Sequence, residues 1–213
     1  MKRLIFSILV AATLWFLMFS SLTAPLLNFW WAMAASAVVL TTLACQEGVL
    51  QRLHASLGRD EHIVRSVIRE VLLGIAIAVV LWGVFWVGDK VASWLFPFAR
   101  PQVDLIYGMK TGNQPWLIAL LLLFIIGPAE ELFWRGYVQH RLGERWSPTL
   151  GYVFATAIYT LVHLPSGNFM LIMAAMVCGV CWGGLYRLMP RHFLAILLSH
   201  ALWDCAAFVW FPI

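Results

Sequence analysis

The chain has 213 residues, of which 62% are hydrophobic and only 11% are charged, and its mean hydropathy is +0.86. Soluble domains carry about 25% charged residues, and a globule of this size cannot hide so much apolar surface from water. The composition therefore excludes a water-soluble globular domain and predicts an integral membrane protein. The formal net charge of +4 comes from basic residues scattered over the ends of apolar segments, so it does not indicate binding to nucleic acid.

Long unbroken apolar segments predict an all-α fold, a polytopic bundle of membrane-spanning helices. A helical crossing needs about 20 residues, so the chain has room for about seven spans joined by short connections. The first segment is long and is not followed by a small-residue cleavage site, so we expect a retained helix rather than a signal peptide. We expect one integral membrane domain over residues 1–213. The expected spans cover residues 4–22, 26–45, 71–87, 116–141, 148–163, 168–189 and 193–211.

The distribution of Lys and Arg predicts which side of the membrane each connection faces. With the N-terminus inside, three basic residues lie outside, namely Lys90, Arg100 and Lys110. Ten lie inside, namely Lys2, Arg3, Arg52, Arg59, Arg65, Arg69, Arg141, Arg145, Arg187 and Arg191. This bias predicts a multi-pass protein with a cytoplasmic N-terminus and the C-terminus outside. Several of the twelve tryptophans lie at the ends of the expected spans, as an interfacial belt would require.

Ionisable side chains inside a membrane are energetically costly, so they are functional candidates by default. Glu130 lies eleven residues before Arg141, which places it about 17 Å from the inner boundary at 1.5 Å per residue. By the same arithmetic His163 lies about 22 Å deep and His200 about 14 Å deep. Three polar groups from three different spans therefore converge near the middle of the bilayer.

The first of these spans carries two adjacent glutamates for which we predict different roles. Glu131 and Arg135 are four residues apart on one helix face, so a salt bridge between them is expected. Glu130 points about 100° away around the helix and has no cation in its own helix. A carboxylate in such an apolar setting suits a general base.

The other two spans repeat the four-residue spacing. Asp204 can reach His200 and fix the tautomer of its imidazole, and Tyr159 and His163 share a face. A single buried histidine is often structural, but that interpretation does not account for Glu130, His163, His200 and Asp204 together. We therefore predict that these four form a functional site, with Glu131, Arg135 and Tyr159 in supporting positions.

Three segments resemble the motifs of a known family of intramembrane proteases, the CPBP (CaaX-processing and bacteriocin-processing, or ABI) family. Residues 130–135, EELFWR, match its EExxxR motif. Residues 200–204, HALWD, match its last motif, in which His is followed four residues later by Asn or Asp. Residues 159–163, YTLVH, take the place of its Phe-xxx-His motif, with Tyr in place of Phe. The resemblance covers about residues 115–210, which we expect to form the catalytic core.

The resemblance implies an intramembrane glutamic endopeptidase that hydrolyses a peptide bond of a membrane-associated protein or peptide. It implies that Glu130 with His163 activates a water molecule, and that His200 and Asp204 stabilise the oxyanion or position the groups that do. The compact loops favour the inner (plasma) membrane of a bacterium. The lipid bilayer and the substrate are the expected partners.

Two alternatives to this function stay open at the level of sequence. Carboxylates and histidines at mid-membrane also serve as proton or cation relays in transporters, although no internal repeat is visible here. A non-catalytic scaffold that kept the same residues is the other alternative. We expect no cofactor. Zinc is not excluded, because Glu, His and Asp are zinc ligands, but there is no HExxH motif.

A CxxC pattern formed by Cys178 and Cys181 has a simpler explanation than redox or metal chemistry. Gly179, Gly183 and Gly184 interleave with the two cysteines. Small residues at this spacing let two membrane helices approach closely. We therefore predict a helix-packing face.

Overall fold

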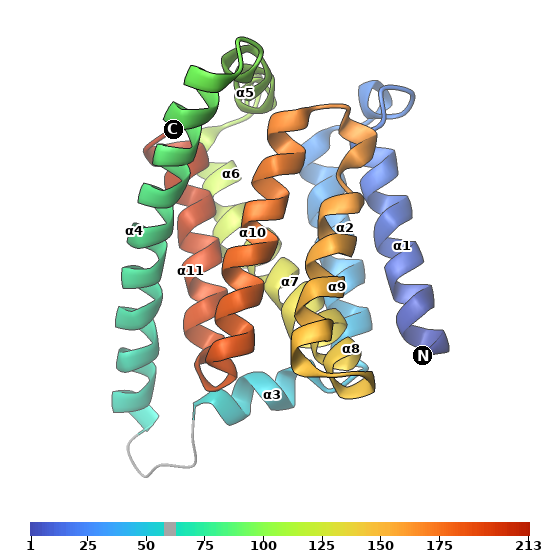
Figure 1. The fold of residues 1–213 in the computed structure, drawn as a ribbon, viewed down its shortest axis with the longest axis vertical. Helices are drawn as coiled ribbons and strands as arrows, with labels where there is room; N and C mark the ends of the chain where they lie inside the picture. Colours follow the sequence, from blue (N-terminus) through green and yellow to red (C-terminus); the bar gives the residue numbers. More distant parts are fainter. Residues whose placement is uncertain (58–62) are drawn as a thin grey trace.

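In the computed structural model, which describes residues 1–57 and 63–213, the chain is a bundle of helices (Figure 1). The expected all-α class is confirmed for that part of the chain. Arg59, one of the ten basic residues assigned to the inner side, lies outside the described residues. The helices are α1 (Lys2–Phe19), α2 (Phe29–Cys45), α3 (Val49–Ser56), α4 (Ile63–Leu95), α5 (Ala99–Gly108), α6 (Pro115–Leu121), α7 (Gly127–Glu130), α8 (His140–Arg145), α9 (Pro148–Leu161), α10 (Phe169–Leu188) and α11 (Phe193–Cys205). Three π-helical segments continue α6, α7 and α11, namely Leu122–Ile126, Glu131–Gln139 and Ala206–Trp210.

The number of full membrane spans is smaller than the seven expected. Over the described residues, five helical stretches are long and apolar enough to cross a membrane, or six if the bent pair α2 and α3 counts as one span. Relative to a count of six, the missing span is α9, whose 14 residues extend only about 21 Å, against about 30 Å for a hydrocarbon core. The protein is nevertheless multi-pass, and its two termini lie at opposite ends of the bundle (Figure 1).

Helix α4 is much longer than the span predicted at 71–87, because it absorbs polar residues on both sides. Its 33 residues include Glu70, which is fully buried. The Glu70 carboxylate accepts hydrogen bonds from the Ala195 amide at 3.3 Å and pairs with His192 at 2.9 Å. A buried carboxylate with such partners is tolerated inside a helix. Polarity alone therefore placed the start of the predicted span too late.

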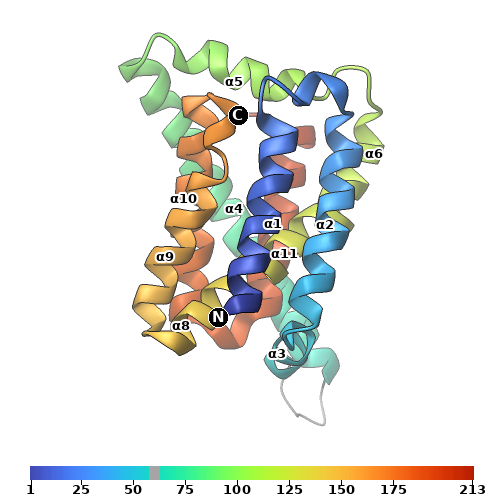
Figure 2. The same cartoon turned by 90° about the vertical axis from the view of Figure 1, so that its right-hand side faces the viewer.

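The segment between the spans predicted at 71–87 and 116–141 contains a further helix, α5. This helix lies across the end of the bundle that is opposite to α3 (Figure 2). The Tyr107 hydroxyl donates to the Ala207 carbonyl oxygen at 2.9 Å, which ties α5 to the end of α11. The Asn168 amide donates to the Gln102 carbonyl oxygen at 2.9 Å and ties α5 to the start of α10.

Basic residues of the predicted inner group gather at one end of the bundle. Glu47 lies 3.6 Å from both Arg3 and Arg141, so residues far apart in the sequence share one polar cluster. The N-terminus, α3 and α8 lie at this end, whereas α5 lies at the other (Figure 1). Clustering of this kind is what the Lys/Arg bias requires. Which end faces the cytoplasm remains a prediction.

The outer surface of the bundle is apolar, as contact with lipid requires. On α4, Leu72, Val79 and Val80 are 62%, 66% and 64% exposed. Only 17% of the most apolar stretch of α4 is buried, against 56% for the stretch within Pro115–Arg145. The helix with the EExxxR motif is therefore the central one, and α4 is peripheral.

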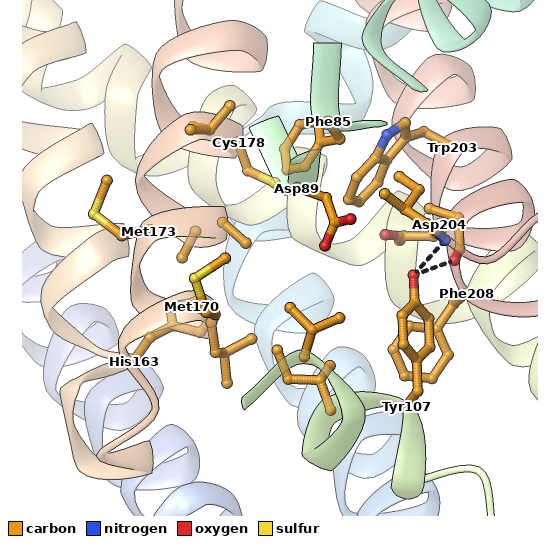
Figure 3. A pocket seen from close by; sticks show the side chains of 18 of the residues that line it. Phe85, Asp89, Tyr107, His163, Met170, Met173, Cys178, Trp203, Asp204 and Phe208 are labelled. Carbon is orange, nitrogen blue, oxygen red and sulfur yellow. Dashed lines mark hydrogen bonds between the residues drawn. The ribbon is translucent and has the colours of Figure 1, made fainter. Parts of the chain in front are cut away.

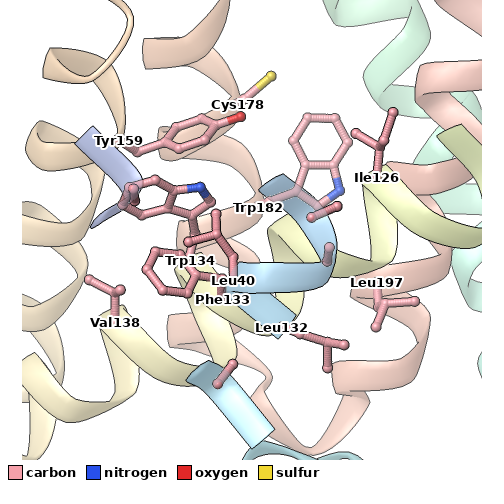
Figure 4. Packing of buried hydrophobic residues seen from close by; sticks show 14 of the residues in the cluster. Leu40, Ile126, Leu132, Phe133, Trp134, Val138, Tyr159, Cys178, Trp182 and Leu197 are labelled. Atoms are coloured by element: carbon pink, nitrogen blue, oxygen red, sulfur yellow. The ribbon is translucent and has the colours of Figure 1, made fainter. Parts of the chain in front are cut away.

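The buried core surrounds this central helix and contains tryptophans that were expected at the interfaces. Trp15, Trp134 and Trp182 are at most 1% exposed, and Trp134 and Trp182 pack among aliphatic side chains in the middle of the bundle (Figure 4). Their indole rings fill large volumes between α1, α10 and the segment after α7. An interfacial belt therefore accounts for only part of the tryptophan content.

Small residues allow the helices around the core to approach closely. A Cβ atom on Gly179 would lie 2.8 Å from Thr156 of α9, and the Thr156 hydroxyl donates to the Gly179 carbonyl oxygen at 3.1 Å. Cys178 and Cys181 are free thiols. The predicted packing face on α10 is confirmed.

Candidate active site

The segment that carries Glu130 and Glu131 departs from regular α-helix. Pro128 lies within α7, where it removes one backbone hydrogen-bond donor, and the following residues, Glu131–Gln139, form a π-helix. Such wide turns are frequent at functional sites. Gly127 brings this segment against α11, because a Cβ atom there would lie 2.7 Å from the Cα of Ala201. The two glutamates are thereby placed beside the histidine of α11.

A cavity of about 580 Å³ lies inside the bundle, between this segment and α5 (Figure 3). Most of its wall is aromatic or aliphatic. Its polar wall contains five of the seven residues predicted from the sequence, namely Glu130, Tyr159, His163, His200 and Asp204. The remaining two, Glu131 and Arg135, lie behind this wall and are 0% and 2% exposed.

Glu130 is held by a strong hydrogen bond from the neighbouring helix α9. Its Oε2 atom accepts from the Tyr159 hydroxyl at 2.6 Å. The Tyr159 ring in turn lies 4.9 Å from the guanidinium carbon of Arg135, a cation–π contact. The hydroxyl that replaces the Phe of the family motif thus orients the predicted base.

The predicted pairing of Glu131 with Arg135 is confirmed. Arg135 Nη1 lies 2.9 Å from Glu131 Oε1, and Nη2 donates to the Cys178 carbonyl oxygen at 2.8 Å. Both side chains are removed from solvent. Arg135 therefore neutralises Glu131 and ties the motif helix to α10.

His200 is held by Glu131 rather than by Asp204, which corrects the sequence-based expectation. Its Nδ1 atom lies 2.6 Å from Glu131 Oε1, whereas its Nε2 atom lies 3.7 Å from Asp204 Oδ1, beyond hydrogen-bonding distance. A carboxylate only accepts, so Nδ1 carries the proton in this pair. The ring also stacks on Trp182, with centroids 4.4 Å apart. Contacts between helices therefore set the tautomer, and Nε2 faces the cavity and Asp204.

Both ring nitrogens of His163 have hydrogen-bond partners within the protein, one just before it in the chain and one on a distant helix. Its Nδ1 atom lies 2.7 Å from the Tyr159 carbonyl oxygen, and its Nε2 atom lies 3.1 Å from the indole nitrogen of Trp15. Trp15 comes from α1, 148 residues earlier in the chain. Its only signal in the sequence is a tryptophan in the interior of the first apolar segment, rather than at one end.

Asp89 is a further charged residue on the cavity wall, two residues beyond the span predicted at 71–87. It lies on α4 and is 7% exposed. Its carboxylate is paired with Lys90 at 3.1 Å and with Arg100 at 3.6 Å. Figure 3 shows Asp89, His163 and Asp204 around the cavity. The paired cations give Asp89 a tethering role between α4 and α5.

Among the described residues, the side chains around the cavity are not arranged to hold a metal ion. A catalytic zinc site needs three protein ligands. No group of three His, Cys, Asp or Glu side chains within residues 1–57 and 63–213 is arranged to hold one. His163 uses both ring nitrogens in hydrogen bonds within the protein, to the Tyr159 carbonyl oxygen and to the Trp15 indole.

This architecture defines a multi-pass membrane protein with a cluster of polar side chains on the wall of a cavity in its bundle. Residues 112–206 match the family described as type II CAAX prenyl endopeptidase Rce1-like. The chain therefore carries an Rce1-like domain of the CPBP group over those residues, which confirms the resemblance. All seven predicted site residues lie within the match, whereas Trp15 and Asp89 lie outside it. No curated protein and no solved structure matches the chain.

Proposed function

We propose that the protein is an intramembrane endopeptidase that hydrolyses a peptide bond of a membrane-associated protein or peptide, with Glu130 as the general base. The observation that carries this proposal is that Glu130, His163, His200 and Asp204 line one cavity and all lie within the Rce1-like match. The apolar remainder of the wall suits a substrate that arrives from the bilayer.

The proposed first step is the attack of water on the scissile carbonyl carbon. Glu130 takes one proton from the water as the new C–O bond forms, and the carbonyl oxygen becomes an oxyanion. The bond from Tyr159 fixes one carboxylate oxygen, so the other is available to the water. A single positioned base of this kind contributes about 10²–10⁴-fold to rate.

His200 is the imidazole that this geometry leaves available to the reaction. Glu131 accepts from Nδ1–H, as a carboxylate does when it orients a catalytic histidine. Nε2 is thereby directed toward the cavity, where its protonated form donates to the oxyanion. Collapse of the tetrahedral intermediate breaks the C–N bond, and the proton held by Glu130 passes to the leaving amine. Asp204 Oδ1 lies 3.7 Å from Nε2, on the same side of the imidazole as the cavity.

The proposed setting is the inner membrane of a bacterium, with the N-terminus in the cytoplasm. The ten-to-three bias of basic residues supports this orientation, and Arg3 and Arg141 of the inner group share Glu47 at the end where the chain begins. The substrate class is proposed only as membrane-associated protein or peptide.

A comparison of peptide termini in cell membranes tests the proposal. Cells express the wild type, Glu130→Gln, or the matched control Glu144→Gln, which changes a glutamate that is half exposed on α8. New termini identified by mass spectrometry are expected with the wild type and the control, and are expected to vanish with Glu130→Gln at equal levels of folded protein. The same termini with Glu130→Gln would contradict the assignment of the base.

A further inference from the structure

A second cavity, of about 500 Å³, lies at the end of the bundle where the chain begins. Its wall is formed by the first turn of α1, by α8, by the turn after α2 and by Tyr137 of the segment after α7. Figure 1 and Figure 2 both show the start of α1 beside α8 at this end. The basic side chains on the wall come from these two helices, namely Lys2 and Arg3 of α1 and Arg141 and Arg145 of α8.

The charges on this wall do not balance. Four cationic side chains face two carboxylates, those of Glu47 and Glu144, which leaves an excess of two positive charges. Glu144 already pairs with Arg141 at 2.9 Å, and Glu47 is shared by two arginines at 3.6 Å. Within the described part of the chain, Lys2 and Arg145 form no ion pair. Like charges from two helices therefore converge on one cavity, where they repel each other unless an anion lies between them.

The cavity lies at the level expected for lipid headgroups. Helix α1 is long and apolar enough to cross a membrane, and its 18 residues extend about 27 Å, close to the thickness of a hydrocarbon core. Its first turn, which lines the cavity, therefore lies at the edge of that core. Directly after this turn, Ile5, Phe6 and Leu9 are exposed on the surface of α1. An acyl chain packed along these side chains would place its headgroup at the cavity.

We infer that this cavity binds the phosphate-bearing headgroup of an anionic phospholipid between α1 and α8. Phosphate oxygens accept charge-assisted hydrogen bonds from Lys and Arg, and basic cavities between membrane helices bind such headgroups. The excess of two positive charges matches a lipid with two phosphates better than a lipid with one, and a zwitterionic lipid least well. The bound lipid links α1, which lies outside the Rce1-like match, to α8, which lies inside it.

Native mass spectrometry of the full chain, released from detergent micelles and titrated with lipid, tests this site. The probes differ in headgroup charge: cardiolipin carries two phosphates, phosphatidylglycerol carries one, and phosphatidylcholine has no net charge. Glycerol 3-phosphate supplies the same phosphate chemistry without acyl chains. The wild type is expected to bind one cardiolipin most tightly, phosphatidylglycerol less tightly, and phosphatidylcholine about tenfold or more weakly than cardiolipin. Glycerol 3-phosphate is expected not to displace the lipid.

Two double variants separate this cavity from general surface charge. Lys2→Gln with Arg145→Gln removes two cations from the wall and leaves no described carboxylate without its partner. The matched control, Arg187→Gln with Arg191→Gln, removes two exposed cations near the turn between α10 and α11, at the same end of the bundle but outside the cavity (Figure 1). The affinity for cardiolipin is expected to fall about fivefold for each cation removed from the wall, or about 25-fold for the pair. The control is expected to stay within about twofold, because distant exposed charges are screened.

Three results would overturn the inference. Equal affinity of the wild type for cardiolipin and phosphatidylcholine would show that headgroup charge plays no part. Equal losses in the two double variants would show that the whole basic surface attracts anionic lipid and that the cavity is not a site. Displacement of cardiolipin by glycerol 3-phosphate would show a site for soluble phosphate instead of lipid.

Thermal unfolding of the wild type keeps the inference testable if a variant does not fold. A ligand that binds only the folded protein raises Tm, so cardiolipin is expected to raise Tm more than phosphatidylglycerol does. Phosphatidylcholine at the same concentration is expected to leave Tm nearly unchanged. Equal shifts with all three lipids would contradict a site selective for anionic headgroups.

Discussion

Removal of Arg135 is expected to destabilise the protein strongly, although Arg135 does not line the cavity. Its guanidinium lies 2.9 Å from Glu131 and both side chains are at most 2% exposed. Arg135→Ala leaves a buried carboxylate with His200 as its remaining partner. Breaking a buried pair by removing one member costs about 3–5 kcal/mol. The Cys178 carbonyl oxygen also loses its donor, which adds to the loss.

The assay is the free energy of unfolding in mixed detergent micelles, measured for single and double variants. Arg141→Ala is the control, because its pair with Glu144 has the same 2.9 Å separation but is about half exposed. A surface pair contributes about 0–1 kcal/mol. Glu131→Gln added to Arg135→Ala is expected to recover part of the loss, since it removes the stranded charge. A loss below about 1 kcal/mol for Arg135→Ala, or no recovery in the double variant, would refute the reasoning.

Three further results are expected. Gly127→Ala is expected to lower the free energy of unfolding by about 1–3 kcal/mol in the same assay. The added Cβ atom would lie 2.7 Å from the backbone of Ala201, which cannot move aside. An unchanged free energy of unfolding would mean that α7 and α11 separate easily. Asp204→Asn is expected to keep the rate of cleavage within about tenfold of the wild type, whereas Asp204→Ala is expected to lower that rate about a hundredfold. An equal loss of rate in both folded variants would show that the negative charge itself is needed. A topology reporter fused after Arg145 is expected to lie on the cytoplasmic side of the membrane, and one fused after Pro101 is expected to lie on the outer side. The opposite pair of signals would show that the predicted orientation is inverted.

The sequence was sufficient to predict features that depend on composition or on spacing within one helix. An 11% share of charged residues predicted the membrane bundle. The four-residue spacing predicted the contact of Glu131 with Arg135, which the structure shows at 2.9 Å. Spacing also placed Tyr159 beside His163, where the Tyr159 carbonyl oxygen lies 2.7 Å from Nδ1. Such features depend on helix geometry, which the sequence determines locally.

Features that depend on packing between helices were missed or assigned wrongly. The same four-residue rule predicted that Asp204 holds His200, but Glu131, 69 residues away, has the shorter contact. Trp15 carries no local sign of its bond to His163, because nothing within α1 specifies which helix lies against it. The length of α4 was underestimated because Glu70 is satisfied by partners on another helix. Periodicity cannot reveal such partners.

The opposite surroundings of two adjacent glutamates connect the fold to the proposed chemistry. Glu131 is turned into the core, where Arg135 and His200 both contact its Oε1 atom. Glu130 is turned into the cavity, where a neutral hydroxyl holds it. If Arg135 paired with Glu130 instead, the cation would stabilise the carboxylate and weaken it as a base. The site therefore retains a usable base because the neighbouring glutamate takes up the buried cation, and the same glutamate orients the imidazole proposed to complete the reaction.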